Sequence, residues 1–264
     1  MQEYWELALS ASKVSILSEE LVTELGGSKV FFCENELVFG HKTAACIYKE
    51  ALKNLQRNRS VGVFADLAVV INGELSLAWN IKSENLSVLD LVTELHFNKL
   101  SLILHRKAAV AWEFRKKLII LQSKLPINEL EMVLELAELH KQNYYLWEYR
   151  RWLWQNYLIA EEKQKELETI MKYCEIHPSD SSSFHYLAEC ISSLNEKKSG
   201  YMWISDLCKK YYGENGLYAE KYPPGYETLN LFRAKMRENY ESDQEYKNEQ
   251  IRLGRNIRYL YVNN

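Results

Sequence analysis

The stretch Asn143–Trp154, with the sequence NYYLWEYRRWLW, decides how the rest of this chain is interpreted. On a helix, residues spaced three, four and seven positions apart share one face. Four large side chains of the stretch have this spacing: Trp147, Arg150, Arg151 and Trp154. An arginine head is costly to bury unless its N–H groups find partners. This face is therefore expected to meet an element that supplies both apolar area and carbonyl or carboxylate oxygens.

The aromatic anchor of this stretch recurs along the chain at nearly constant intervals. Trp79, Trp112 and Trp147 follow one another after 33 and 35 residues. Phe184 comes 37 residues after Trp147, and the last equivalent position, Asn230, follows after another 46. The residues three positions after these five anchors are mostly cations: Lys82, Arg115, Arg150, Leu187 and Arg233. A period of about 34 residues is typical of solenoids built from antiparallel helix pairs.

The repeat gives the tryptophans and the cations expected structural roles. Trp79, Trp112 and Trp147 are interpreted as packing anchors between successive helix pairs, since large rings fill such joints. Arg115, Arg150 and Arg233 are expected to bind carbonyl or carboxylate oxygens of a neighbouring repeat or of a partner protein. The recurrence of the spacing argues against arginines that are merely solvated.

Composition and charge exclude several classes of protein. The 264 residues include only 10 Gly and 4 Pro, which favours long helices with few turns. The net charge of −3 leaves no basic excess for binding nucleic acid. The 5 cysteines are scattered and odd in number, which is typical of reduced thiols and predicts a cytoplasmic location. We expect no signal peptide, because the first residues lack a basic region and a long apolar run. We expect no membrane span, because no stretch reaches about 18 apolar residues.

The pattern predicts an all-α fold in three parts. Residues 1–59 are interpreted as a short helix or arm, an extended segment over 29–39 and a helix over 41–56. Residues 60–242 are expected to form the repeats, and 243–264 a helix that caps the end of the array. Within the repeats the predicted helices end at residue 72 and then cover 74–86, 89–105, 108–124, 128–140, the opening stretch, 161–176, 181–194, 201–212 and 226–240.

Several segments of the chain resemble the repeats of protein prenyltransferase alpha subunits. Those repeats read roughly as Asn-Tyr, two further residues and then Trp-x-x-Arg-Arg. The segments that carry the likeness are AVAWEFRKKLI, NYYLWEYRRWLW, HPSDSSSFHYLAECI and YETLNLFRAKM. The likeness extends over about residues 29–240. It is most specific around Trp147, good around Trp79 and Trp112, and degraded in the last two repeats.

The resemblance implies a fold, a function and a set of partners. The fold would be a right-handed α-α superhelix, a crescent of antiparallel helix pairs wrapped around a catalytic beta subunit. The chain would be the alpha-type subunit of a heterodimeric enzyme that transfers a geranylgeranyl group to protein cysteines. The zinc and the isoprenoid diphosphate would bind to the beta subunit, for which that of Rab geranylgeranyltransferase is the first candidate. A protein substrate would be the other partner. This chain alone would show no enzymatic turnover.

The resemblance also assigns auxiliary site residues. In the family, a lysine five positions before the second tryptophan faces the diphosphate, and Lys107 occupies that position here. A lysine beside a departing diphosphate stabilises the charge that grows in the transition state. A Tyr-His pair of the third repeat falls on Tyr144 and Tyr145, so the tyrosine matches and the histidine does not. The family's second-repeat tyrosine is replaced by Ala109, which removes one hydroxyl contact.

Two alternative functions compete with this interpretation. A scaffold similar to tetratricopeptide proteins would bind a peptide on its concave face without any prenyl transfer. Such adaptors keep small residues at fixed repeat positions, whereas this chain keeps tryptophans and arginines. A self-contained enzyme lacks support, because the sequence contains no HExxH, P-loop, GxGxxG or GxSxG motif.

One set of residues has the composition of a structural zinc site but not its geometry. The set comprises Cys174, His177, His185 and Cys190. Pro178 separates the first pair from the second, and His185 and Cys190 are five positions apart on one predicted helix. They would therefore point in different directions, and we expect no metal on this chain.

Overall fold

The architecture comes from a computed structural model of the chain. The structure describes residues 1–24, 29–122, 124–194, 199–200, 202–204 and 206–207. The chain divides into two compact units, Met1–Arg150 and Arg151–Asn264, with the division inside one helix. Each unit is described by itself below.

The N-terminal unit begins with a short helix, one of the two forms expected for this segment, and continues with a small sheet. Its elements are α1 (Gln2–Ser10), β1 (Lys13–Leu17), α2 (Glu19–Glu24), β2 (Val30–Cys33) and β3 (Glu36–Gly40). The strand order is β1-β3-β2, with β1 parallel and β2 antiparallel to β3. The extended segment predicted over 29–39 is thus a hairpin, whose turn residues Glu34 and Asn35 both have positive φ, as two-residue turns of type I′ require.

The strand β1 was missed by the sequence analysis, which gave residues 1–28 a short helix or an arm. The five residues KVSIL alternate only weakly, with Val14 buried and its neighbours partly exposed. Their partner is β3, where Val14 lies opposite Leu37, 23 residues further on. Such a pairing depends on tertiary contacts that no local pattern records.

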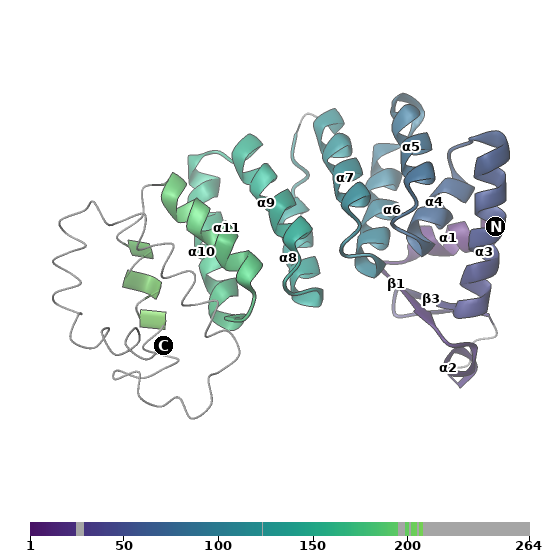
Figure 1. Ribbon diagram of the computed structural model, residues 1–264, viewed down its shortest axis with the longest axis horizontal. Helices are drawn as coiled ribbons and strands as arrows, with labels where there is room; N and C mark the ends of the chain where they lie inside the picture. The colour runs from purple at the N-terminus through teal and green to yellow at the C-terminus, as the bar shows by residue number, and fades with distance from the viewer. Residues whose placement is uncertain (25–28, 123, 195–198, 201, 205, 208–264) are drawn as a thin grey trace, which may run out of the picture. The chain divides into compact units, whose positions relative to one another are not determined.

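Helices account for the rest of the N-terminal unit and stack side by side (Figure 1). They are α3 (His41–Asn58), α4 (Val63–Ile71), α5 (Ser76–Glu84), the short 3-10 helix η1 (Leu86–Val88), α6 (Leu91–Leu104), α7 (Ala109–Gln122), α8 (Glu129–Leu139) and the first half of α9 (Tyr144–Asn156). The first helices of successive pairs, α4 and α6, contact each other, as do the second helices, α5 and α7. The predicted all-α helical-repeat class is confirmed, with the sheet as an N-terminal addition.

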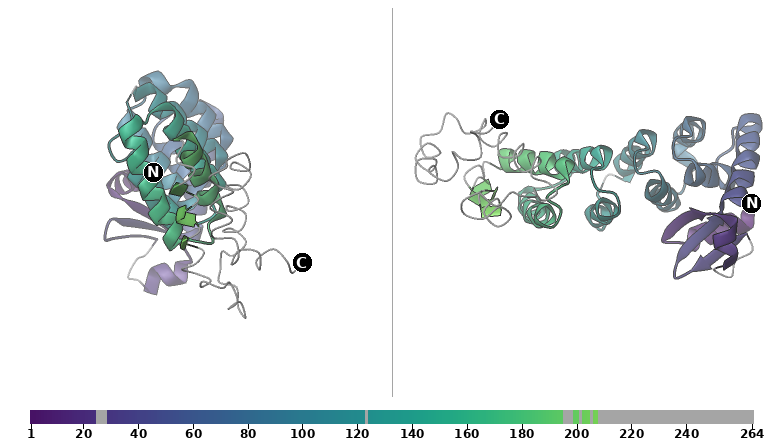
Figure 2. Two further views of the ribbon diagram at one scale, coloured as in Figure 1. Left: turned by 90° about the vertical axis from the view of Figure 1, so that its left-hand side faces the viewer. Right: turned by 60° about the horizontal axis from the view of Figure 1, so that its bottom comes forward.

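The sheet is attached to the first repeats by a shared apolar core. Figure 2 shows the strands lying against one side of the first helices. Leu37 and Phe39 from β3 are fully buried together with Leu67 of α4 and Phe97 of α6. Trp5 of α1 stacks on Phe97, with ring centroids 5.9 Å apart. The N-terminal elements therefore cover the end of the repeat array that would otherwise expose apolar helix faces.

The second unit contains the end of α9, then α10 (Ala160–Ile176) and α11 (Ser181–Ser193). The cap of α11 is Asp180, whose carboxylate accepts hydrogen bonds from the backbone of Ser182 and Ser183. The described residues among 199–207 are helical. The predicted helices over 226–240 and 243–261, and the remainder of 201–212, lie outside the described residues. Among the helices that the structure describes, none has the length and apolar character that crossing a bilayer would need.

Candidate functional site

The tryptophan anchors are buried, and the indole nitrogens of Trp79 and Trp112 bind the turns that join the helices of a pair. Trp79, Trp112 and Trp147 are each no more than 3% exposed. Trp79 Nε1 donates to the carbonyl of Gly73 at 2.8 Å, and Trp112 Nε1 donates to the carbonyl of Arg106 at 3.1 Å. Both bonds span six residues, so each anchor caps the turn immediately before its own helix. The anchor thus supplies apolar area and a polar bond at once.

Trp79 and Trp112 also contact an aromatic ring of the following second helix in a tilted arrangement. The rings of Trp79 on α5 and Phe114 on α7 have centroids 4.9 Å apart. The rings of Trp112 on α7 and Tyr149 on α9 lie 5.1 Å apart. Both partner rings stand two positions after the anchor of their own helix. The interaction therefore joins neighbouring repeats in the same way each time.

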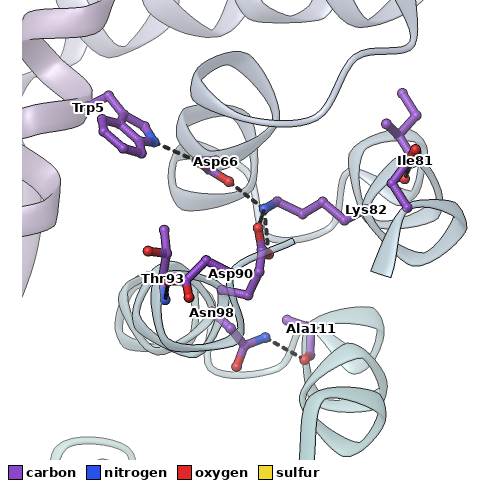
Figure 3. A network of polar contacts seen from close by, with 10 residues as sticks. Trp5, Asp66, Ile81, Lys82, Asp90, Thr93, Asn98 and Ala111 are labelled. Carbon is purple, nitrogen blue, oxygen red and sulfur yellow. Dashed lines mark hydrogen bonds and ion pairs between the residues drawn. The ribbon is translucent and has the colours of Figure 1, made fainter. Parts of the chain in front are cut away.

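The first cation, Lys82, lies in a buried cluster of charges shown in Figure 3. Its ammonium donates to Asp66 and to both oxygens of Glu94, at 2.8 and 2.6 Å for the latter. Trp5 Nε1 donates to the other oxygen of Asp66 at 2.6 Å. All three charged side chains are at most 4% exposed. The cluster joins α1, α4, α5 and α6, and it contains one more carboxyl group than it has cations.

The surplus carboxyl group changes the protonation of the cluster. Burial raises the pKa of Glu94 above its usual 4.5, and the neighbouring charges of Asp66 and Asp90 add to this effect. The ammonium of Lys82 acts in the opposite direction without cancelling the shift. A buried carboxyl beside a second carboxylate favours its neutral form for these reasons.

The second cation, Arg115, joins three helices. Its Nε and Nη2 donate to the two oxygens of Glu129 on α8, at 2.6 and 2.7 Å. Its Nη1 donates to the carbonyl of Leu95 and to Asn98 on α6, both at 3.1 Å. Tyr149 donates to the same Glu129 carboxylate at 2.7 Å, and burial raises the pKa of that phenol well above 10. The arginine therefore meets a carbonyl of its own pair and a carboxylate of the next pair.

The cations of the opening stretch differ in burial. Arg150 is 1% exposed, and its Nη1 donates to the carbonyl of Leu130 at 2.8 Å. Leu130 stands 35 residues after Leu95, so this bond repeats the one that Arg115 makes. Arg151 is partly exposed and pairs with Glu189 on α11 at 2.5 Å. The stretch thus has one fully buried cation and one near the surface.

Sequence reasoning missed two further sets of repeated residues that share these intervals. Glu94, Glu129 and Glu166 are buried near the starts of α6, α8 and α10. Tyr186 donates to Glu166 at 2.9 Å, the counterpart of the bond from Tyr149 to Glu129. The three acids follow one another after 35 and 37 residues, the same intervals as Trp112, Trp147 and Phe184. Extending the repeat from the tryptophans to every polar position would have found them.

The second missed set is histidine. His105, His140 and His177 directly follow α6, α8 and α10 and are again 35 and 37 residues apart. The ring nitrogen of His105 bonds to the carbonyl of Val70 at 3.0 Å, and that of His140 to the carbonyl of Ile103 at 2.7 Å. Burial lowers the pKa of His105, which favours the neutral ring. His105 and His140 thus join first helices to one another, so their role is structural.

The auxiliary residues predicted from the family resemblance are exposed in one turn and at one helix start of the N-terminal unit. Lys107 is exposed in the turn between α6 and α7. Tyr144 and Tyr145 begin α9 and are 63% and 38% exposed, with ring centroids 5.7 Å apart. The buried amide of Asn143 connects the two turns, because its Nδ2 donates to the carbonyl of Arg106 at 2.8 Å. We call Lys107, Tyr144 and Tyr145 the lysine–tyrosine edge.

The remaining residues singled out in the sequence lie in different parts of the chain. Phe184 is buried on α11, with its ring centroid 6.5 Å from that of Trp203. Arg233 lies outside the described residues. The thiol of Cys174 is buried, which raises its pKa, and it donates to Ser183 Oγ at 3.3 Å. Within the part of the chain that the structure describes, no group of three or more His, Cys, Asp or Glu side chains could hold a metal ion.

Comparison with known proteins gives the repeats a family context. Residues 111–211 match the family described as the ECM9 middle domain. Over 182 residues the chain is 26% identical to a curated protein of Danio rerio, and over 175 residues it is 25% identical to one of Homo sapiens. Both are named protein prenyltransferase alpha subunit repeat-containing protein 1. The chain is similar to this protein. The resemblance to prenyltransferase alpha subunits that the sequence indicated is thereby confirmed.

The extent of the match limits what it transfers. The aligned regions cover 58% and 56% of this chain, but only 42% and 43% of the two relatives. The chain thus matches less than half the length of either prenyltransferase alpha subunit repeat-containing protein. The likeness concerns the repeats, and activity, substrate and partners are matters for proposal.

Proposed function

We propose that this chain is the alpha-type subunit of a heterodimeric protein prenyltransferase, a scaffold that holds no metal. A catalytic beta subunit would carry the zinc and transfer a geranylgeranyl group to a cysteine of a protein substrate. The beta subunit of Rab geranylgeranyltransferase is the first candidate for this partner, and the cytoplasm is the proposed location. The complex, rather than this chain alone, would be the enzyme.

The observation that carries the proposal is the recurrence of a buried aromatic anchor and a buried cation on successive second helices. Trp79 with Lys82, and Trp112 with Arg115, repeat one arrangement in a chain whose relatives are named for prenyltransferase alpha subunit repeats. Because the anchors and cations make their contacts within the helix array, they support a scaffold role for this chain. The groups left for a partner or ligand are those on exposed turns.

The lysine–tyrosine edge supports a direct contribution to the chemistry. In prenyl transfer the cysteine thiolate attacks the first carbon of the isoprenoid, the carbon–oxygen bond breaks, and diphosphate leaves with the bonding electrons. The exposed ammonium of Lys107 and the hydroxyls of Tyr144 and Tyr145 are groups that stabilise such an anion. Arg106 and Lys141 are also exposed in the same two turns, so the local charge is positive.

Co-expression with a prenyltransferase beta subunit tests the proposal. We expect the two chains to co-purify as a stoichiometric complex that transfers labelled geranylgeranyl to a protein with a C-terminal cysteine. Lys107→Ala should lower the turnover of that complex on the order of 100-fold, the loss typical of one preorganised charge donor. Lys53→Ala, which removes another exposed lysine, from α3, should leave turnover unchanged.

Two results of these experiments would contradict the proposal in whole or in part. A chain that ignores every beta subunit but captures peptides would refute the proposal and favour the scaffold similar to tetratricopeptide proteins. A complex that forms and turns over, but is unaffected by Lys107→Ala, would leave the scaffold role and remove the lysine–tyrosine edge from the chemistry.

A further inference from the structure

The amide of Asn143 occupies the junction between the two turns that carry the lysine–tyrosine edge. It is 1% exposed, although it is adjacent in sequence to the exposed Tyr144. Its Nδ2 donates to the carbonyl of Arg106 at 2.8 Å, across 37 residues of sequence. Its Oδ1 accepts from the backbone N–H of Leu146 at 3.4 Å, in the first turn of α9. One side chain thus reaches the turn before α7 and the start of α9 together.

The carbonyl that Asn143 holds belongs to the peptide directly before Lys107. The same carbonyl accepts from Trp112 Nε1 at 3.1 Å. A carbonyl oxygen has two lone pairs, so these two donors use both of them. The peptide between Arg106 and Lys107 is therefore fixed from its own helix pair and from the next one.

The equivalent positions of the two neighbouring repeats cannot form this double clamp. Ala108 occupies the place of Asn143 in the preceding repeat and offers no side-chain donor to the carbonyl of Gly73. Asp180 occupies it in the following repeat, and its carboxylate accepts bonds from Ser182, Ser183 and Tyr173. Among these three positions only residue 143 has an amide, which can accept and donate at the same time.

We infer that Asn143 is a positioning residue that holds the turn of Lys107 against the start of α9, so that Lys107, Tyr144 and Tyr145 act on one anionic group. This inference rests on the proposed function, because the anionic group is the leaving diphosphate. Asn143 itself does not touch the reacting atoms. It acts through Lys107, whose backbone it fixes on one side, and through the helix start that it caps on the other.

Two substitutions separate the two roles of the amide. Asn143→Asp keeps an oxygen that caps α9 but loses the donor to Arg106, whereas Asn143→Ala loses both. We expect backbone amide hydrogens of residues 105–109 to exchange faster in both variants. Those of residues 145–148 should exchange faster only in Asn143→Ala. The wild-type chain and Lys53→Ala are the references, and thermal melting shows whether each variant remains folded.

The catalytic consequence is measured in the complex with the beta subunit. Asn143→Asp should lower kcat on the order of 10- to 100-fold, the size expected when a charged group is misplaced by about 1 Å. The KM for the protein substrate should stay the same. In the double variant Lys107→Ala with Asn143→Asp, kcat should equal that of Lys107→Ala alone, because both changes remove one effect. A merely structural role would instead make the two losses multiply.

Failure of the inference can be told from failure of the proposed function. Unchanged exchange at residues 105–109 in Asn143→Asp would overturn the clamp whatever the activity. Multiplicative losses in the double variant would overturn the action through Lys107. A wild-type complex that forms but transfers no prenyl group would refute the proposed function and the catalytic part of the inference, while faster exchange would still establish the clamp.

Discussion

The sharpest structural prediction concerns Arg115, the cation that joins three helices. Arg115→Met keeps much of the apolar stem and removes the guanidinium, which is 4% exposed and pairs with both oxygens of Glu129. The carboxylate of Glu129, only 2% exposed, would keep the hydroxyl of Tyr149 as its remaining charge-stabilising partner. Removing one partner of a buried ion pair typically costs about 3–5 kcal/mol. We expect a loss of that size in the free energy of unfolding.

Urea unfolding, followed by tryptophan fluorescence, measures this loss. With a slope of about 2 kcal/mol per molar urea, the midpoint should fall by roughly 1.5–2.5 M. The double variant Arg115→Met with Glu129→Met should recover at least half of the loss, because no unpaired charge remains. Lys99→Met is the control: it breaks an exposed pair with Glu135 and should change stability by less than about 1 kcal/mol.

The result that would refute the reasoning is a small effect at the buried site. If Arg115→Met lowered stability no more than Lys99→Met, the buried ion pair would not join the repeats. If the double variant were as unstable as the single one, the loss would come from packing rather than from the unpaired carboxylate of Glu129.

Three further predictions follow from the buried polar contacts. The pKa of Glu94 is raised in the folded state, so the unfolded chain releases that proton at a lower pH. The stability of the wild type relative to Glu94→Gln should therefore fall as pH rises above about 4.5. Thermal melts in which the stability difference between wild type and variant stayed constant or grew with pH would contradict this. Tyr149→Phe should lower the free energy of unfolding in urea by about 1–3 kcal/mol, because Glu129 loses a buried hydrogen-bond donor. An unchanged free energy of unfolding would contradict this role of Tyr149. Trp5→Phe, which keeps the stacking but removes the donor to Asp66, should cost about 1–3 kcal/mol as well, and should speed amide exchange in α1.

Most of the helical architecture could be predicted from the sequence because the anchors recur at a regular interval and several helices carry boundary signals. Asp90, for example, caps α6 by accepting from the backbone of Thr93, and Pro178 separates α10 from α11. The strand β1 could not be predicted, since Val14 finds its partner Leu37 only in the folded chain. Local chemistry fixes the first kind of feature, and tertiary pairing fixes the second.

The buried polar contacts also divide into those that the sequence indicates and those that depend on tertiary structure. The sequence showed that cations follow the tryptophans, but not that Arg115 would meet Glu129 or that Lys82 would face two carboxyl groups. Glu94 and Glu129 were visible in principle, because they are separated by the same 35 residues as Trp112 and Trp147. The clamp by Asn143 was beyond any pattern, since it depends on a single amide that contacts a carbonyl 37 residues away.

The measurement that tests the central claim most directly is prenyl transfer by a purified pair of chains. This chain, the beta subunit of Rab geranylgeranyltransferase and their complex are each given labelled geranylgeranyl diphosphate and a protein with a C-terminal cysteine. The account predicts label on the cysteine with the complex and none with this chain alone. A stable complex that leaves the cysteine unlabelled, or full activity of the beta subunit without this chain, would contradict it.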